Sequence, residues 1–371
     1  MKITKVEATC HSIPVMLPLD KPMKQNLVFV RVETDEGITG YGLTHHQLRF
    51  STREFINREL APFLIGKNPF ETERIWNKDA ENELNVAHSL FTTAAMIRWG
   101  FSAVDIALWD IKGKYFNQPV FRLLGGSRNP IPAYVTCGFR VYNREELVEV
   151  ARQFVQMGQK NLLVQLGLGT TPGLNIAEDE ARVRAVREVI GEDGMLMVDG
   201  NDRFNFIEAR ALARRIEPYH ISWFEGPVFS NSDFRLLAAF RKCTSIPITA
   251  GGSVPGRRWL YREFFLHNAV DLVQPNVVHV GGYTEALKIA HMAQAFGLPV
   301  ANGGGQPHHN MHLIAGVANG WIVECQYATM LRDEIIFVNP PRFEKGWLTV
   351  PEKPGLGLEV NEAALKEYIE A

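Results

Sequence analysis

Acidic and amide side chains follow two successive short apolar runs of the chain. Run 195–198 ends in Asp199 and Asn201, and run 221–224 ends in Glu225. Because alternate side chains of a strand share a face, Asp199 and Asn201 are predicted to point the same way. Carboxylate and amide oxygens are the ligands that Mg²⁺ prefers. We therefore expect Asp199 and Glu225 to hold Mg²⁺ or the substrate, and Asn201 to bind the substrate; the alternative is that the acids only cap the following loops and helices.

Eight short apolar runs, separated by amphipathic stretches, occupy the chain beyond residue 130. They begin near Ile131, Asn161, Met195, His220, Ile246, Ala269, Leu298 and Trp321. This alternation predicts an α/β fold, a (β/α)8-type (modified TIM) barrel, rather than an open doubly wound sheet. No dinucleotide fingerprint follows the first run, which also disfavours a Rossmann domain. In such a barrel the catalytic groups lie at the carboxyl ends of the strands.

The first part of the chain has a different pattern. Residues 1 to about 45 alternate like antiparallel strands, and 51–115 are predicted to be helical. We expect an N-terminal α+β capping domain at 1–128, joined by the C-terminal segment 344–371, and a barrel domain at 129–343 that carries the site. The polar stretch 19–26 is expected to be a loop, either a lid or a passive surface segment.

Composition limits the possible partners. The chain has 371 residues, of which 46% are hydrophobic and 22% charged, with a formal net charge of -2. That balance gives no basic surface for nucleic acid or for an anionic membrane. The four cysteines form no CxxC pair, and the N-terminus has no apolar core of signal-peptide length. We expect a cytoplasmic protein that acts on a small molecule.

The other predicted strand ends are rich in amides. They carry Gln165 after the second strand, Asn276 after the sixth, Asn302 after the seventh and Glu324 in the eighth. Glu324 can accept or donate a proton. We expect Glu324 and Asn302 to be catalytic, and Gln165 and Asn276 to bind the substrate.

A glycine-rich stretch follows the seventh strand. Residues 303–305 are three glycines, and His308 and His309 come shortly after them. Glycines let the backbone approach a ligand, and a histidine titrates near neutral pH. His308 is therefore a candidate catalytic base; the alternative is a tight loop followed by histidines that begin the next helix.

Several motifs together resemble one family. They are SAVDIALWD (102–110), LLGG (123–126), VDGN (198–201), WFEGP (223–227), QPN (274–276) with Gly281–Gly282, and PGLG (354–357). In this order they resemble the enolase superfamily, in its mandelate racemase/muconate lactonizing enzyme branch. The resemblance implies abstraction of the proton α to a substrate carboxylate, Mg²⁺ stabilising the enediolate, a capping domain that closes over the barrel, and a homo-oligomer.

The catalytic positions depart from that family pattern. Segment 163–165 (Leu-Val-Gln) stands where the family has Lys-x-Lys, and Gly252 stands at the third metal-ligand position. The histidine–aspartate dyad of mandelate-racemase-like members falls on Asn302 and Asn276, and amides cannot shuttle protons. Glu324 matches a family acid. With one anionic ligand fewer, Mg²⁺ is expected to bind more weakly.

Three hypotheses for the function follow. The first is an isomerase or lyase, of the racemase, cycloisomerase or dehydratase type, that acts on a hydroxylated carboxylate such as a sugar acid through a rebuilt active site. The second is a catalytically retired barrel that binds a small sugar-acid-like ligand. The third is a phosphate-binding barrel enzyme that uses the glycines near Gly281 and Gly304.

Overall fold

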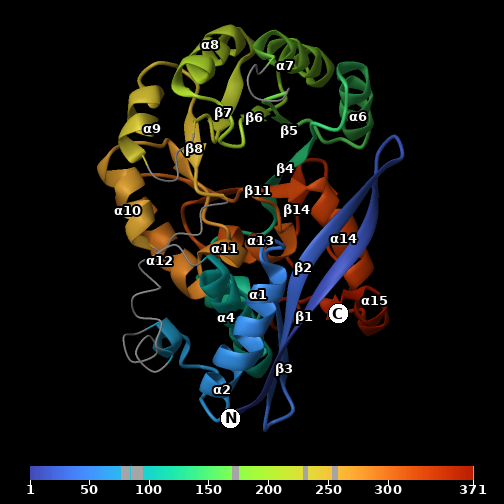
Figure 1. The fold of residues 1–371 in the computed structure, drawn as a ribbon, viewed down its shortest axis with the longest axis vertical. Coiled ribbons are helices and arrows are strands. Elements are labelled where there is room, and N and C mark those ends of the chain that lie inside the picture. Colours follow the sequence, from blue (N-terminus) through green and yellow to red (C-terminus); the bar gives the residue numbers. More distant parts are fainter. Residues whose placement is uncertain (77–83, 85–94, 169–174, 229–232, 253–257, 371) are drawn as a thin grey trace.

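The barrel predicted from the sequence is present. The computed structural model describes residues 1–76, 84, 95–168, 175–228, 233–252 and 258–370. In this part of the chain, eight parallel strands follow one another around a closed barrel, and β11 pairs with β4 to complete it (Figure 1). The strands are β4 (Ile131–Gly138), β5 (Leu162–Gln165), β6 (Leu196–Asp199), β7 (Ile221–Glu225), β8 (Ile248–Ala250), β9 (Leu272–Val273), β10 (Val300–Ala301) and β11 (Gly320–Gln326).

Helices connect these strands and surround the barrel. They are α6 (Arg144–Gln156), α7 (Ile176–Ile190), α8 (Phe206–Ile216), α9 (Phe234–Arg241), α10 (Arg258–Leu266), α11 (Val277–Val280), α12 (Gly282–Ala295), α13 (Pro307–Gly316) and α14 (Tyr327–Ile336). The N-termini of α6 to α9 are each capped by a side chain that accepts a backbone N–H, from Asn143, Asn175, Asn205 and Asp233. Such caps fix where each helix starts, and therefore how long the preceding loop at the barrel mouth is.

Strand alternation builds two layers inside the barrel. The lower layer is apolar and buried, and includes Tyr134, Leu163, Met197, Trp223 and Ile322. Two residues further along the same five strands stand Thr136, Gln165, Asp199, Glu225 and Glu324. Because the period of a strand is two, the polar layer lies directly above the apolar plug, at the carboxyl ends of the strands.

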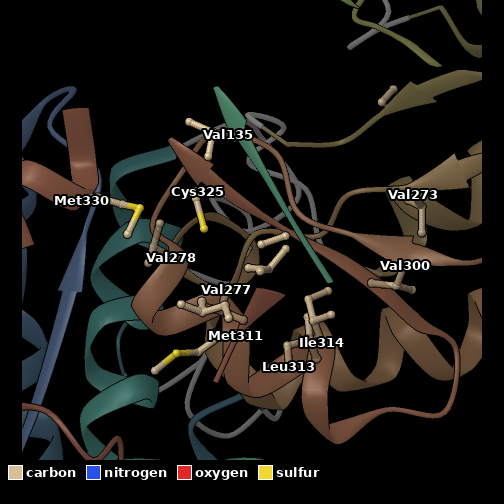
Figure 2. Packing of buried hydrophobic residues seen from close by; sticks show 14 of the residues in the cluster. Val135, Val273, Val277, Val278, Val300, Met311, Leu313, Ile314, Cys325 and Met330 are labelled. Atoms are coloured by element: carbon tan, nitrogen blue, oxygen red, sulfur yellow. The ribbon is translucent and has the colours of Figure 1, made fainter. Parts of the chain in front are cut away.

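The outward faces of the strands belong to a separate and larger core. Figure 2 shows Val135 of β4 and Cys325 of β11 in the same cluster as Val278, Met311 and Met330 of the surrounding helices. These side chains are at most 2% exposed. The helices are thus fixed to the strands by close apolar packing, which holds the strand ends rigid.

The capping domain is built on an antiparallel sheet. Its strands are β1 (Ile3–Leu17), β2 (Lys21–Thr34) and β3 (Thr39–Thr44), and its helices are α1 (Arg49–Phe55), α2 (Ala61–Leu64), α4 (Ala95–Tyr115) and α5 (Val120–Leu123). Short π-helical and 3-10 segments lie at Ile56–Leu60 and Thr72–Trp76. β2 and β3 pair antiparallel, which confirms the antiparallel strands predicted over residues 1 to about 45.

The expectation of a loop at 19–26 is wrong. β1 and β2 pair from Leu17↔Lys21 onward, and Leu19 and Asp20 form a tight turn with φ of 60° and 56°. β3 pairs with Val28–Glu33 of β2, so the end of the β1–β2 hairpin projects beyond β3 towards the barrel (Figure 1). There Tyr142 donates a hydrogen bond of 3.0 Å to the carbonyl of Pro18, and Lys21 pairs with Glu146 at 2.7 Å.

Helix α4 joins the two domains. Ser102 and Asp105 accept hydrogen bonds from the backbone N–H groups of Gly281 and Thr284, and Trp109 donates to the hydroxyl of Thr284. These three side chains recur at helical spacing and share one face of α4. The capping domain is thereby anchored to the start of α12 in the barrel.

The C-terminal segment returns to the capping sheet, where β16 (Ile369–Glu370) pairs with β1. Its other elements are β12 (Phe337–Val338), β13 (Phe343–Glu344), β14 (Trp347–Leu348), β15 (Glu359–Val360) and α15 (Glu362–Glu367). Among the described residues, none of the helices combines the length and apolar character that a membrane crossing requires.

Candidate active site

A polar cavity of about 210 Å³ opens at the carboxyl ends of the barrel strands. We call it the inner cavity. It is lined by Thr136, Gln165, Asp199, Asn201, Asp202, Glu225, Gly226, Ala250, Gly251, Gly252, Gly304, Glu324 and Gln326. Five residues expected at the site are therefore gathered here: Asp199, Glu225, Glu324, Gln165 and Asn201.

Asp199 and Glu225 stand side by side, because they are paired in register on β6 and β7. Both oxygens of Asp199 accept hydrogen bonds from Asn201, one from its backbone N–H at 2.7 Å and one from its side-chain amide. Glu225 accepts a hydrogen bond of 2.8 Å from the amide of Gln274. Burial, together with the charge of Glu324, raises the pKa of Asp199 to about 7, and burial and Asp199 raise the pKa of Glu225 well above its ordinary value.

Glu324 completes a group of three carboxylates that interact electrostatically. One of its oxygens accepts a hydrogen bond of 2.5 Å from the hydroxyl of Thr136, and the other accepts one of 2.6 Å from the backbone N–H of Gly305. Burial raises the pKa of Glu324 to about 7 in spite of these two donors, which favour the ionised form. At neutral pH this carboxyl group is therefore poised to accept or to donate a proton.

Asn276 and Asn302 do not line the inner cavity. The amide of Asn276 donates to the carbonyls of Gly303 and Gly305, and that of Asn302 donates to the carbonyl of Gly305. Both side chains are fully buried. Their geometry supports a role in holding the 303–305 loop, and not the catalytic and substrate-binding roles expected from the sequence.

His308 also lies away from the inner cavity, fully buried in α13. Its Nδ1 lies 2.6 Å from a carboxylate oxygen of Asp333, and its Nε2 lies 2.7 Å from the carbonyl oxygen of Pro341. Asp333 is also paired with the buried Arg332. Both ring nitrogens face acceptors inside the protein, so this geometry does not support the expected role as a base.

The Mg²⁺ expectation can be tested against the donors present. Asp199 and Glu225 are two suitable ligands, but at the third position Gly252 has no side chain, and its backbone packs against Gly303. Within the described ranges, no three His, Cys, Asp or Glu side chains converge as a possible metal site. The donor set does not fit the three-carboxylate Mg²⁺ site that the family implies.

A second space of about 370 Å³ adjoins the first; we call it the outer cavity. It shares Gln165, Asn201, Gly304 and Gln326 with the inner cavity. The β1–β2 hairpin contributes Met23, Lys24, Gln25 and Asn26 to its wall, and His45 and His46 follow β3. Burial lowers the pKa of His45 to about 2, so this ring stays neutral. Another histidine of the same domain, His88, lies outside the described residues.

Sequence reasoning missed two residues of the inner cavity, Thr136 and Asp202. Thr136 lies near the end of the first barrel strand, β4, two positions after Tyr134, so strand alternation places both side chains on the same face and would have identified it. Asp202 follows Asn201 in the Asp-Gly-Asn-Asp turn, and its charge contributes to the raised pKa of Asp199.

Comparisons with known proteins agree with this architecture. Residues 1–125 match the model of the mandelate racemase/muconate lactonizing enzyme N-terminal domain, and 146–364 match that of the enolase C-terminal domain-like family. Arabinonate dehydratase of Saccharolobus solfataricus is 33% identical over 94% of this chain and 91% of its own. The crystal structure of 3,6-anhydro-D-galactonate cycloisomerase from Zobellia galactanivorans is 32% identical, with full coverage of both chains and a TM-score of 0.86.

A third relative was crystallised with ligands. L-talarate dehydratase from Polaromonas sp. JS666, complexed with Mg and L-glucarate, is 27% identical, with a TM-score of 0.86 over 100% of this chain and 98% of its own. Together the two family models cover most of the chain. The protein therefore belongs to the mandelate racemase/muconate lactonizing enzyme family of the enolase superfamily.

Proposed function

We propose that this protein is a lyase or isomerase that removes the proton α to the carboxylate of a sugar acid, with Glu324 as its acid–base group. The observation that carries the proposal is the setting of Glu324 at the wall of the inner cavity, between the Thr136 hydroxyl and the Gly305 N–H. These donors orient the carboxylate, and a pKa of about 7 suits a group that must both take up and return a proton.

The lining of both cavities supports a polyhydroxylated substrate. Carboxylates such as Asp199 and Glu225 accept hydrogen bonds from hydroxyl groups, whereas the amides of Gln165 and Gln326 can donate or accept. Lys24 in the outer cavity supplies a cation for the substrate carboxylate. The relatives named as arabinonate and L-talarate dehydratases point to the same class of substrate.

The chemistry follows from these groups. Glu324 takes the α-proton, and the negative charge that develops on the substrate carboxylate is stabilised by the amide donors of Gln165 and Gln326. Asp199 has a pKa of about 7 and can supply a proton within the same cavity. Delivered to a departing β-hydroxyl, that proton completes a dehydration; delivered to the α-carbon, it completes an isomerisation.

The test is exchange of the α-proton in D₂O. Native protein is incubated with arabinonate, glucarate and related acids, and the α-proton signal is followed by NMR, with formation of 2-keto acid measured in parallel. We expect exchange or product with at least one acid, and a loss of about 100-fold or more in Glu324→Gln. Glu149→Gln, which changes an exposed glutamate on α6, is the matched control.

The retired-barrel hypothesis predicts a different result from the same samples. If an acid binds by calorimetry but its α-proton never exchanges, the protein is a binder and the proposed activity is wrong. If exchange occurs and Glu324→Gln exchanges as fast as native protein, the assignment of Glu324 is wrong.

A further inference from the structure

Two glycine backbones meet where the third metal ligand of the family stands. A Cβ built on Gly252 would lie 2.8 Å from both the Cα and the carbonyl carbon of Gly303. Contacts under 3.0 Å between a Cβ and a backbone require the chain to shift. In this arrangement, any side chain at position 252 would clash with the backbone of Gly303, whatever its charge.

Gly303 also lies close to Glu225. A Cβ on Gly303 would lie 2.6 Å from one carboxylate oxygen of Glu225 and 3.0 Å from the amide nitrogen of Gln274. The other oxygen of Glu225 already accepts the hydrogen bond of Gln274. Gln274 therefore engages one oxygen of this carboxylate, and the Gly303 backbone approaches the other so closely that no side chain would fit between them.

Asp199 is held in a similar way, since Asn201 donates to both of its oxygens. A cation held by the pair would have to compete with protein donors on Asp199 and Glu225, and it would gain no third carboxylate in return. Desolvating a divalent ion without sufficient anionic ligands is unfavourable, and Mg²⁺ in particular gives up its water reluctantly.

We propose that this site has lost its resident divalent cation, and that the Gly303 backbone, with the amides of Gln274 and Asn201, occupies the surroundings of Asp199 and Glu225 in its place. The inference deepens the proposed function, on which its relevance to catalysis rests. Under this inference, abstraction of the α-proton does not require a divalent metal.

The first experiment measures Mg²⁺ binding to chelator-stripped full-length protein by calorimetry, and Mn²⁺ binding by electron paramagnetic resonance. We expect no saturable site with a Kd below about 1 mM that depends on Asp199. Weaker binding that is equal in native protein, Asp199→Ala and Glu225→Gln lies elsewhere and supports the proposal. One equivalent bound more tightly, and lost in both variants, would overturn it.

The second experiment tests the glycine contact itself. Gly252→Ala is expected to melt several degrees below native protein, and Gly252→Glu is expected to create no Mg²⁺ site. A Gly252→Glu protein with native melting temperature and an Asp199-dependent Mg²⁺ site would contradict the steric argument.

The two proposals can fail separately. Absence of metal binding together with absence of α-proton exchange would leave this inference standing and refute the proposed function. Exchange of the α-proton that is abolished by EDTA and restored by Mg²⁺ would support the proposed function and refute this inference.

Discussion

Replacing Thr136 with valine removes one of the two donors that hold Glu324 and keeps the shape of the side chain. The lost hydrogen bond is buried, 2.5 Å long and made to a carboxylate. Hydrogen bonds to charged groups contribute about 1.5–3 kcal/mol, and about 1.4 kcal/mol corresponds to one pKa unit. Because the hydroxyl stabilises the ionised form, its removal should raise the pKa of Glu324 from about 7 by roughly one to two units.

The assay is the pH dependence of α-proton exchange. As a base, Glu324 acts in its ionised form, so the acidic limb of the profile should move to higher pH by the same amount, and the rate at pH 7 should fall roughly five- to fiftyfold. Exchange should recover as the pH rises. Thr249→Val is the matched control, because Thr249 is equally buried but donates to the carbonyl of Leu272 rather than to a carboxylate. A Thr136→Val profile that superimposes on the native one would refute the role of this hydrogen bond.

Three further predictions concern stability and substrate access. The pKa of Asp199 rises on folding from 3.8 to about 7, so the folded state binds more protons than the unfolded state between these pH values. The stability of the native protein should therefore fall as the pH rises from about 4 to about 7. In calorimetric scans, Asp199→Asn should melt a few degrees above native protein at pH 8 and show a smaller difference at pH 4. His308→Ala leaves the buried Asp333 without one partner and should lower the free energy of unfolding by about 3–5 kcal/mol, measured in urea; a loss below 1 kcal/mol would mean that the pair is not structural. Lys21→Met breaks the half-exposed ion pair with Glu146 and should lower the free energy of unfolding by at most about 1 kcal/mol. If the β1–β2 hairpin covers the outer cavity, the same variant should raise KM. An unchanged KM would mean that the hairpin has no role in substrate binding.

The sequence predicted the barrel and much of the polar lining for one physical reason. On strands β5, β6, β7 and β11 the alternation of inward and outward side chains continues up to the polar residue of the cavity, as it does from Met197 to Asp199 and from Ile322 to Glu324. A buried apolar residue therefore indicates the direction of the side chain two positions later.

The same rule fails where the strands are short. β9 and β10 are two residues long, and Asn276 and Asn302 lie beyond them, where strand alternation no longer applies. Asn276 instead caps α11 through its side chain. The partners of His308 come from α14 and from the segment after it, 25 and 33 residues further along the chain, which no local pattern could predict. The tight turn at Leu19 and Asp20 has positive φ angles, which glycine usually supplies in a hairpin. Because this turn contains no glycine, the stretch was predicted to be a loop.

The departures from the family pattern are physically linked. Asn276 accepts hydrogen bonds from the N–H of Val278 and the amide of Asn310 while donating to Gly303 and Gly305. Asn302 accepts from the N–H of Glu324 and donates to Gly305.

An ionised aspartate at either position could only accept, and would face a carbonyl oxygen where the amide now donates. The two amides are thus required by the loop that they hold. That loop in turn brings the N–H of Gly305 to Glu324 and the backbone of Gly303 to Gly252. Gly252, the amides of Asn276 and Asn302, and the orientation of Glu324 are therefore parts of one interlocked arrangement, in which a substitution at any one of these positions would disturb the others.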